Sequence, residues 1–283
     1  MPRLTVIMPA RNAEATAAGA VRSTLRAMPR DAELVVWDDA SEDRTSEVVE
    51  SIADPRVSVL RGEQRRGSGA ARRELMARTD SELVANIDAD DVSLPWRFRV
   101  QLRHLSYLDA SFATTFRFRG NLRSVRWSGG YAYTAEETPL ALVVHNVLPH
   151  STFVARRSAV ESAGGYRALP VAQDYDLWLR MAANGARLGR LRTPTAAYRQ
   201  SPTQVSGARD YHARANEQAE LRDAYAALAE RVLGEPLRPG DRGLKAVQEA
   251  TLARVGELAG ERKRAYYRTL IESGTTFQLL PPG

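Results

Sequence analysis

Four apolar segments, each typical of a short buried β-strand, lie within the first 87 residues and constrain the fold more than any other feature. They are Leu4–Met8, Glu33–Trp37, Arg56–Leu60 and Leu83–Ile87. Each is followed by a polar or glycine-containing loop and then by a segment with helical periodicity. Repeated β–α units of this kind predict an α/β fold with a mostly parallel, doubly wound sheet and right-handed crossovers.

The loops that follow these four segments are the candidate ligand-binding regions. They contain Pro9–Asn12, Asp38–Asp39, the turn around Gly67, and Asp88–Asp91. In a parallel sheet the carboxyl ends of the strands meet at one edge, and open α/β sheets bind ligands there. Because all four strands end in polar or glycine-rich loops, we expect these loops to line a single cleft.

The fourth loop, Asp88-Ala89-Asp90-Asp91, is the strongest candidate for a metal site. If the chain stays extended beyond the strand, Asp88 and Asp90 lie on one side of it, about 6–7 Å apart. Carboxylates this close repel one another unless a cation lies between them, and hard oxygen ligands suit Mg²⁺ or Mn²⁺. The alternative is an acidic loop that caps a helix near Pro95 and binds no metal.

A second acidic pair, Asp174 and Asp176, opens a helix predicted over Asp174–Asn184. A carboxylate at a helix start accepts backbone N–H groups and stabilises the helix dipole, which is a structural role. The alternative is that one of the pair acts as a general base, since the start of this helix can face the cleft. His150, at the start of a strand predicted over 150–155, is a weaker candidate for contact with an acceptor or a phosphate.

Composition excludes several functional classes. The 283 residues carry a net charge of +6, but the basic residues are nearly all arginine, are scattered, and accompany 34 acidic residues. No nucleic-acid-binding motif is present, so we expect no nucleic-acid partner. A basic rim that serves phosphorylated substrates or anionic lipid head groups stays open. The absence of cysteine excludes disulfides and thiolate metal sites.

Hydropathy gives no sign of a membrane span or a leader. No stretch of about 18 apolar residues occurs, and the N-terminus enters a predicted strand without a signal-peptide pattern. We therefore expect a cytoplasmic protein without a transmembrane segment. Peripheral contact with a membrane remains compatible with the basic composition.

The remainder of the chain is predicted to contain further strands and a helical tail. Helices are expected over 95–108, 139–146 and 157–163, antiparallel strands or a hairpin within 110–133, and a late strand pair at 187–192 and 195–198. From about residue 206 the sequence pattern is that of amphipathic helices. Helices are predicted over 211–233, 241–258 and 261–273, with a linker at 234–243. We divide the chain into a domain of 1–204, with halves 1–109 and 110–204, and a C-terminal extension of 205–283. This extension is a candidate surface for a homodimer.

Five short motifs occur in an order that resembles a known family. They are Val6–Asn12, Asp38–Thr45, Gly67–Arg72, Asp88–Asp91 with Pro95, and Gln173–Arg180. Together they resemble the family 2 glycosyltransferases, inverting nucleotide-sugar enzymes with the GT-A fold, over residues 4–199. The resemblance implies metal-dependent transfer of a sugar from a nucleoside-diphosphate sugar, with a UDP-sugar expected, to an acceptor hydroxyl. Because the Gln-x-x-Arg-Trp motif of processive synthases is absent, transfer of a single sugar is expected.

The resemblance also implies roles for individual residues. Those expected to bind the nucleotide sugar are Pro9, Ala10, Arg11, Asn12, Asp38, Asp39, Arg72, Asp88 and Arg199. Asp90 is expected to hold Mn²⁺ or Mg²⁺, and Asp174 to be the general base, with Gln173 where the family more often has glutamate. The candidates for contact with the acceptor are His150, Asp176 and Trp178.

Two other functions fit parts of the pattern. A sugar-nucleotide pyrophosphorylase needs a glycine-rich first loop and a lysine near the phosphates. Here the first loop is Pro-Ala-Arg-Asn, and both lysines, Lys245 and Lys263, lie in the tail. A non-catalytic nucleotide-sugar-binding module would be indicated by loss of the acidic motif or of the base, and both are present.

Overall fold

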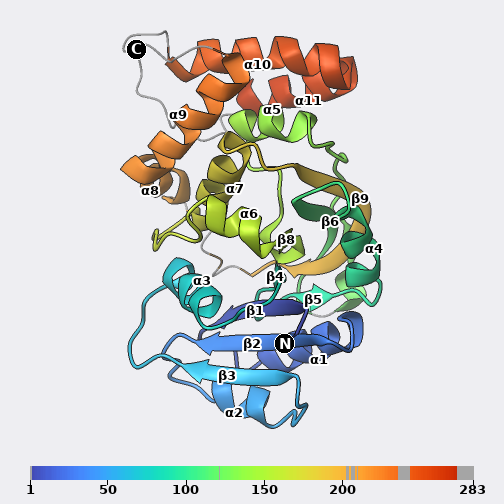
Figure 1. The fold of residues 1–283 in the computed structure, drawn as a ribbon, viewed down its shortest axis with the longest axis vertical. Helices are drawn as coiled ribbons and strands as arrows, with labels where there is room; N and C mark the ends of the chain where they lie inside the picture. The colour runs from blue at the N-terminus through green and yellow to red at the C-terminus, as the bar shows by residue number, and fades with distance from the viewer. Residues whose placement is uncertain are drawn as a thin grey trace.

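The structure is a computed structural model in which residues 2–120, 122–201, 204, 208, 210–234 and 243–272 are described. Within them, one mixed sheet is flanked by helices, with strand order β3-β2-β1-β4-β8-β6-β9-β5 and β7 paired to β6 (Figure 1). The C-terminal helices lie at the end of the molecule opposite β3 and α2. The predicted α/β fold with a helical C-terminal region is confirmed.

The first half of the sheet is the parallel unit predicted from the sequence. β1 (Leu4–Ala10) lies between β2 (Ala32–Asp38) and β4 (Leu83–Asn86), and β3 (Val57–Arg61) lies outside β2. The connecting helices are α1 (Ala17–Ala27), α2 (Thr45–Glu50) and α3 (Ser68–Ala77). Since all four strands run in the same direction, their carboxyl ends lie along the same edge.

Both faces of this half are buried. Val6 and Met8 of β1 pack with Val21 of α1 in one core, whereas Ile7 packs with Leu75 of α3 in the other. This alternation follows from the two-residue period of a strand. Burial on both faces explains why these strands appear in the sequence as nearly continuous apolar runs.

The second half of the sheet is mostly antiparallel. β4 pairs with β8 (Val154–Arg156), and β8 pairs with β6 (Ala110–Phe118). β6 runs parallel to β9 (Leu188–Arg199), which pairs with the short β5 (Val92–Ser93). β7 (Arg126–Trp127) returns along β6, which confirms a hairpin in this region.

Helices cover this half and form the C-terminal region. Those within the sheet domain are α4 (Arg97–His104), α5 (Glu137–Val144), α6 (Arg157–Ser162) and α7 (Gln173–Ala183). Those that follow are α8 (Tyr211–Asn216), α9 (Ala219–Leu233), α10 (Gly243–Ala259) and α11 (Glu261–Glu272). α9 packs against α7, and α10 and α11 pack against α5. Among the described residues, none of the helices combines the length and the apolar character needed to cross a bilayer.

Two predicted elements near the strand ends differ from the structure. The helical segment predicted after the loop Pro9–Asn12 does not start directly after that loop but at Ala17, because the N–H groups of Ala13 and Glu14 donate to the side chains of Thr45 and Asp43 in the neighbouring loop. The strand expected at 150–155 is a 3-10 turn, η2 (His150–Thr152), followed by β8.

Two later elements also differ. The strand pair expected at 187–192 and 195–198 is one strand, β9, with an irregularity opposite β6 between Ala113 and Thr115. The helix expected over 211–233 is interrupted between Asn216 and Ala219, giving α8 and α9. Most of the predicted linker lies outside the described residues, and the division of the chain after 109 and 204 stays a prediction.

Candidate active site

The loops after β1 and β2 hold each other in place. Asn12 lies in the left-handed region with φ 46°, which asparagine tolerates better than most residues. Its Oδ1 accepts the N–H of Glu42, and its own N–H donates to Ser41 Oγ, both at 2.9 Å. Arg11 donates to the carbonyl of Asp39 at 3.1 Å and pairs with Glu42 at 3.0 Å. The sequence correctly predicted that these loops share one edge of the sheet.

The two aspartates at the end of β2, Asp38 and Asp39, are buried. Asp38 Oδ1 accepts the N–H of Ser41 at 2.9 Å, and Oδ2 accepts a hydrogen bond from Ser46 Oγ. The two oxygens of Asp39 accept the N–H groups of Arg66 and Gly67, at 2.9 and 2.8 Å, and so fasten the Gly67 loop to β2. Each carboxylate oxygen accepts one of these bonds and keeps a further lone pair that could accept a hydrogen bond from a ligand. In this structure Asp38 and Asp39 shape the loops.

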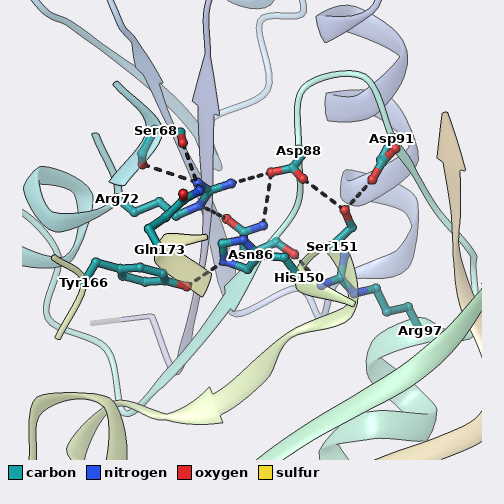
Figure 2. A network of polar contacts seen from close by, with 10 residues as sticks. All are labelled: Ser68, Arg72, Asn86, Asp88, Asp91, Arg97, His150, Ser151, Tyr166 and Gln173. Atoms are coloured by element: carbon teal, nitrogen blue, oxygen red, sulfur yellow. Dashed lines mark hydrogen bonds and ion pairs between the residues drawn. The ribbon is translucent and has the colours of Figure 1, made fainter. Parts of the chain in front are cut away.

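Arg72 of α3 connects the helix to the acidic loop (Figure 2). Its Nη2 donates to Asp88 Oδ1 at 2.6 Å and its Nε to Asn86 Oδ1 at 2.8 Å. The Arg72 side chain is almost completely buried, so this charged pair is stronger than an exposed one. Burial alone would raise the pKa of Asp88, but the charge of Arg72 and hydrogen bonds from Asn86 and Ser151 hold that pKa below its usual value. Asp88 is therefore a carboxylate at neutral pH.

The acidic loop is a turn. β4 ends at Asn86, and the N–H of Asp91 donates to the carbonyl of Asp88 at 3.1 Å. The prediction that Asp88 and Asp90 alternate along an extended chain is wrong, because the chain turns at Ala89 and Asp90. Ser151 lies between the turn's first and last carboxylates, donating to Asp88 Oδ2 at 3.2 Å and to Asp91 Oδ2 (Figure 2).

Arg199, at the end of β9, holds this turn from the other side. Its backbone N–H donates to Asp91 Oδ1 at 2.8 Å, and its Nε donates to the carbonyl of Asp90 at 2.9 Å. Its Nη1 reaches the carbonyl of Gly120 at 2.6 Å, and its guanidinium lies 4.5 Å from the Phe118 ring centroid. The structure thus brings the predicted phosphate contact Arg199 to the acidic turn, where it positions the backbone.

The Asp90 carboxylate is suited to a divalent cation. It is half-buried, and burial followed by the charge of Asp88 raises its pKa to about 6. A cation would relieve this repulsion. No group of three or more histidine, aspartate or glutamate residues that could enclose a metal occurs among the described residues. Mg²⁺ and Mn²⁺ need no such group when one carboxylate, water and substrate phosphates complete the coordination, so the residues present fit.

Asp174 lies in the first turn of α7, which the structure begins at Gln173. Asn146 Nδ2 donates to Asp174 Oδ2 at 3.2 Å, and Gln173 Nε2 donates to Ser68 Oγ at 3.0 Å, which connects α7 to α3. Burial raises the pKa of Asp174 above its usual value, although nearby N–H groups, the charge of Arg72 and the Asn146 hydrogen bond oppose the shift. Asp174 and Asp88 thus both lie within the electrostatic influence of Arg72.

The structure does not support two of the acceptor contacts expected from the sequence. Asp176 is completely buried, 2.5 Å from Arg180 and 3.1 Å from Arg167. Trp178 is completely buried against the ring of Phe112. Helical periodicity explains the first outcome, because Asp176 lies two positions after Asp174 and so faces the other side of α7. Trp178 lies one turn after Asp174 on a similar side of the helix, and it is covered by the rings of Phe112 and Phe153.

His150 lies nearer to the candidate site. Its Nε2 is 2.9 Å from the hydroxyl of Tyr166, and it directly precedes Ser151 (Figure 2). Burial, followed by the charge of Arg72, places the pKa of His150 well below its usual value, so its imidazole is neutral. A neutral imidazole can donate or accept a hydrogen bond but supplies no positive charge for a phosphate.

With this geometry in place, comparison with known proteins identifies the family. A model described as "Glycosyl transferase family 2" matches residues 5–163, more than half of the chain. The chain belongs to this glycosyltransferase family. The succinoglycan biosynthesis protein ExoU of Rhizobium meliloti (strain 1021) is 32% identical over 200 residues, 64% of this chain and 57% of ExoU. The chain therefore spans little more than half the length of that relative.

Solved structures support the fold. Residues 1–349 of S. aureus TarS in complex with UDP-GlcNAc align with a TM-score of 0.67 and 19% identity, over 91% of this chain and 73% of that one. The mannosyltransferase PcManGT from Pyrobaculum calidifontis, in complex with GDP-Man and Mn²⁺, aligns with a TM-score of 0.57 and 18% identity, over 97% of this chain and 79% of that one. Identities this low show a shared fold, and the predicted GT-A class is confirmed.

Several residues at the site were not predicted from the sequence. Ser151 and Asn146 carry no pattern that distinguishes them from other polar residues in loops. Asn86 does carry a signal, since an amide at the end of an otherwise apolar strand is unusual and needs a buried partner. That partner is Arg72.

Proposed function

We propose that the protein transfers a single sugar from a nucleoside-diphosphate sugar to an acceptor hydroxyl, with inversion at the anomeric carbon. The observation that carries the proposal is the arrangement around α3, whose Arg72 binds Asp88 in the acidic turn and whose Ser68 accepts a hydrogen bond from Gln173, the neighbour of Asp174 in α7. Membership of glycosyl transferase family 2 supports it. A UDP-sugar is the donor we assign, and TarS, which shares the fold, binds UDP-GlcNAc.

Asp174 is the general base in this proposal. A base must hold a hydrogen bond to the acceptor hydroxyl and must be a stronger base than an exposed carboxylate, and burial gives Asp174 that property. The hydrogen bond from Asn146 fixes the orientation of the carboxylate. As the acceptor oxygen attacks the anomeric carbon, its proton passes to Asp174 and the bond to the nucleoside diphosphate breaks.

The nucleotide end of the donor is assigned to the edge formed by the loops after β1 and β2, with Pro9–Asn12 and Asp38–Asp39 around the nucleoside. Asp88, held by Arg72, faces the ribose or the sugar. Asp90 would hold Mn²⁺ or Mg²⁺, which when bound supplies positive charge beside the departing diphosphate. Arg199 keeps the turn that carries Asp90 in place.

The test is release of UDP from a panel of UDP-sugars, with and without simple sugar acceptors, by the wild type and by Asp174→Asn. Loss of the base should lower kcat by about 10²–10⁴-fold while the affinity for UDP stays unchanged. The asparagine keeps the size of the side chain and its bond to Asn146. A variant that turns over as fast as the wild type would exclude Asp174 as the base, and absence of turnover with every UDP-sugar would direct the same test to GDP- and TDP-sugars.

A further inference from the structure

A positively charged hairpin lies beside the acidic turn. From Ala110 to Thr134 the sequence contains four arginines and no acidic residue. The arginines are Arg117, Arg119, Arg123 and Arg126, and all four are exposed. They belong to the end of β6, the connection and β7, which we call the cationic hairpin (117–120 and 122–127). Arg192 of the adjacent β9 adds another positive charge, with its guanidinium 5.6 Å from the centroid of the Trp127 ring.

The cationic hairpin also exposes large apolar side chains. Leu122 is 54% exposed, Trp127 48% and Val125 37%. Three such side chains within six residues form a local apolar surface rather than the scattered exposure common on soluble proteins. No acidic side chain of the segment offsets the arginines, so the surface combines apolar groups with a net positive charge.

We propose that the cationic hairpin docks on an anionic lipid bilayer. Tryptophan rings favour the interface between water and lipid, where an apolar ring and a polar N–H are both accommodated. Guanidinium groups bind phosphate through paired hydrogen bonds, and clusters of four or more basic residues bind anionic lipid surfaces. The charge and the apolar side chains of this hairpin are complementary to such a surface.

The hairpin is joined directly to the candidate active site. Arg199 donates from Nη1 to the carbonyl of Gly120 in the hairpin and from its backbone N–H to Asp91 in the acidic turn. A bilayer bound at the hairpin would therefore lie close to the edge of the sheet that carries Asp88–Asp91. The idea that an acceptor held in the membrane reaches the site rests on the proposed function. The binding of the bilayer itself does not.

The test is flotation of the full chain with vesicles of phosphatidylcholine alone or mixed with phosphatidylglycerol. We expect binding to the anionic vesicles, weakened by added salt, and little binding to the neutral ones. Arg123→Gln with Arg126→Gln should lower the partition coefficient by about tenfold or more. The matched control is Arg22→Gln with Arg26→Gln on α1, which removes the same charge from another exposed surface and should retain most of the binding.

Tryptophan fluorescence gives a second readout that does not depend on the arginine variants. Trp127 is more exposed than Trp96, at 48% against 36%, and Trp37 and Trp178 are buried. Anionic vesicles should shift the emission to shorter wavelength, and Trp127→Phe should remove that shift. Failure to bind anionic vesicles, or equal losses of binding in the hairpin and α1 variants, would overturn the proposal. Binding of UDP is measured without lipid, so the proposed function is tested independently of either result.

Discussion

Asp174 and Asp176 are two residues apart on α7, yet their surroundings assign them different roles. Asp174 is half-buried and has one side-chain hydrogen bond from Asn146 at 3.2 Å. Asp176 is completely buried between Arg167 and Arg180. A buried carboxylate that neutralises two guanidinium groups contributes to folding and has no access to a substrate. Asp176 is therefore the structural carboxylate of the pair, and Asp174 is the one that we propose as the general base.

This difference predicts the effect of Asp176→Asn. Removing the charge leaves Arg180, itself almost fully buried, without its ionic partner, and breaking a buried pair costs about 3–5 kcal/mol. Urea denaturation should show a loss of that order, whereas Asp174→Asn should change the free energy of unfolding by less than about 1 kcal/mol. Equal stability of the two variants would contradict the structural role of Asp176.

The buried His145 side chain should make the free energy of unfolding depend on pH. It caps the C-terminus of α5, its Nδ1 is buried without a hydrogen-bond partner among the described residues, and burial followed by the charge of His212 lowers its pKa to about 4. The unfolded chain, with a pKa near 6.5, gains a proton as pH falls, while the folded protein does not. His145 should therefore contribute a loss of about 1–2 kcal/mol of stability between pH 7 and pH 5.

The measurement is urea denaturation at both pH values for the wild type and His145→Asn. The variant should lose part of the pH dependence, since its residue 145 does not titrate. His150 is also neutral when folded and contributes in the same direction, whereas Asp90, whose pKa is raised to about 6, contributes in the opposite direction. The comparison therefore concerns the difference between the two proteins. An identical pH dependence would show that His145 is accessible to protons in the folded state.

At the scale of elements, the contact between α3 and the segment before α7 explains how the acidic turn (Asp88–Asp91) and the start of α7 come together. Gly69, in the first turn of α3, lies so close to that segment that an added Cβ would be 2.5 Å from the carbonyl oxygen of Arg167. The hydrogen bond from Gln173 to Ser68 lies at the same junction. A small residue at this position therefore allows the approach that brings Arg72 toward Asp174.

Gly69→Ala should consequently destabilise the protein by about 1–3 kcal/mol, since the clash is with backbone that cannot rotate away. Gly19→Ala is the matched control, because Gly19 is also in the first turn of a helix and has no atom within 4 Å of an added Cβ. That change should be neutral or stabilising by up to about 1 kcal/mol. Thermal unfolding of both variants decides the point, and a neutral Gly69→Ala would show that the junction is loosely packed.

The sequence predicts the elements of the first half of the sheet well, and those of the second half less well. Strands such as β1 and β2 are buried on both faces and read as continuous apolar runs. β8 has only three residues, and its partners in β4 and β6 are distant in the chain, so the local pattern predicts a strand there but places its start too early. The interruption between α8 and α9 likewise lacks a proline or glycine signal.

At the scale of the whole molecule, the residues that complete the candidate site come from distant parts of the chain. Ser151 binds Asp88 across 63 positions, and the Arg199 backbone binds Asp91 across 108. The motifs identify Asp88, Asp90 and Asp174, because their residue types match the expected chemistry. The supporting contacts depend on sheet order, in which β8 lies beside β4, and this order cannot be read from periodicity.

We propose that the edge of the sheet at the carboxyl ends of β1, β2 and β4 binds a nucleoside diphosphate together with a divalent cation at Asp90. Calorimetric titration of UDP into the protein, with Mn²⁺ and then with EDTA, tests it most directly, using the wild type and Asp90→Asn. We predict binding that requires Mn²⁺ in the wild type and is weakened at least tenfold in the variant, which loses the carboxylate that fits a hard cation. Binding of UDP that is equal with Mn²⁺ and EDTA, or unchanged in Asp90→Asn, would contradict the account.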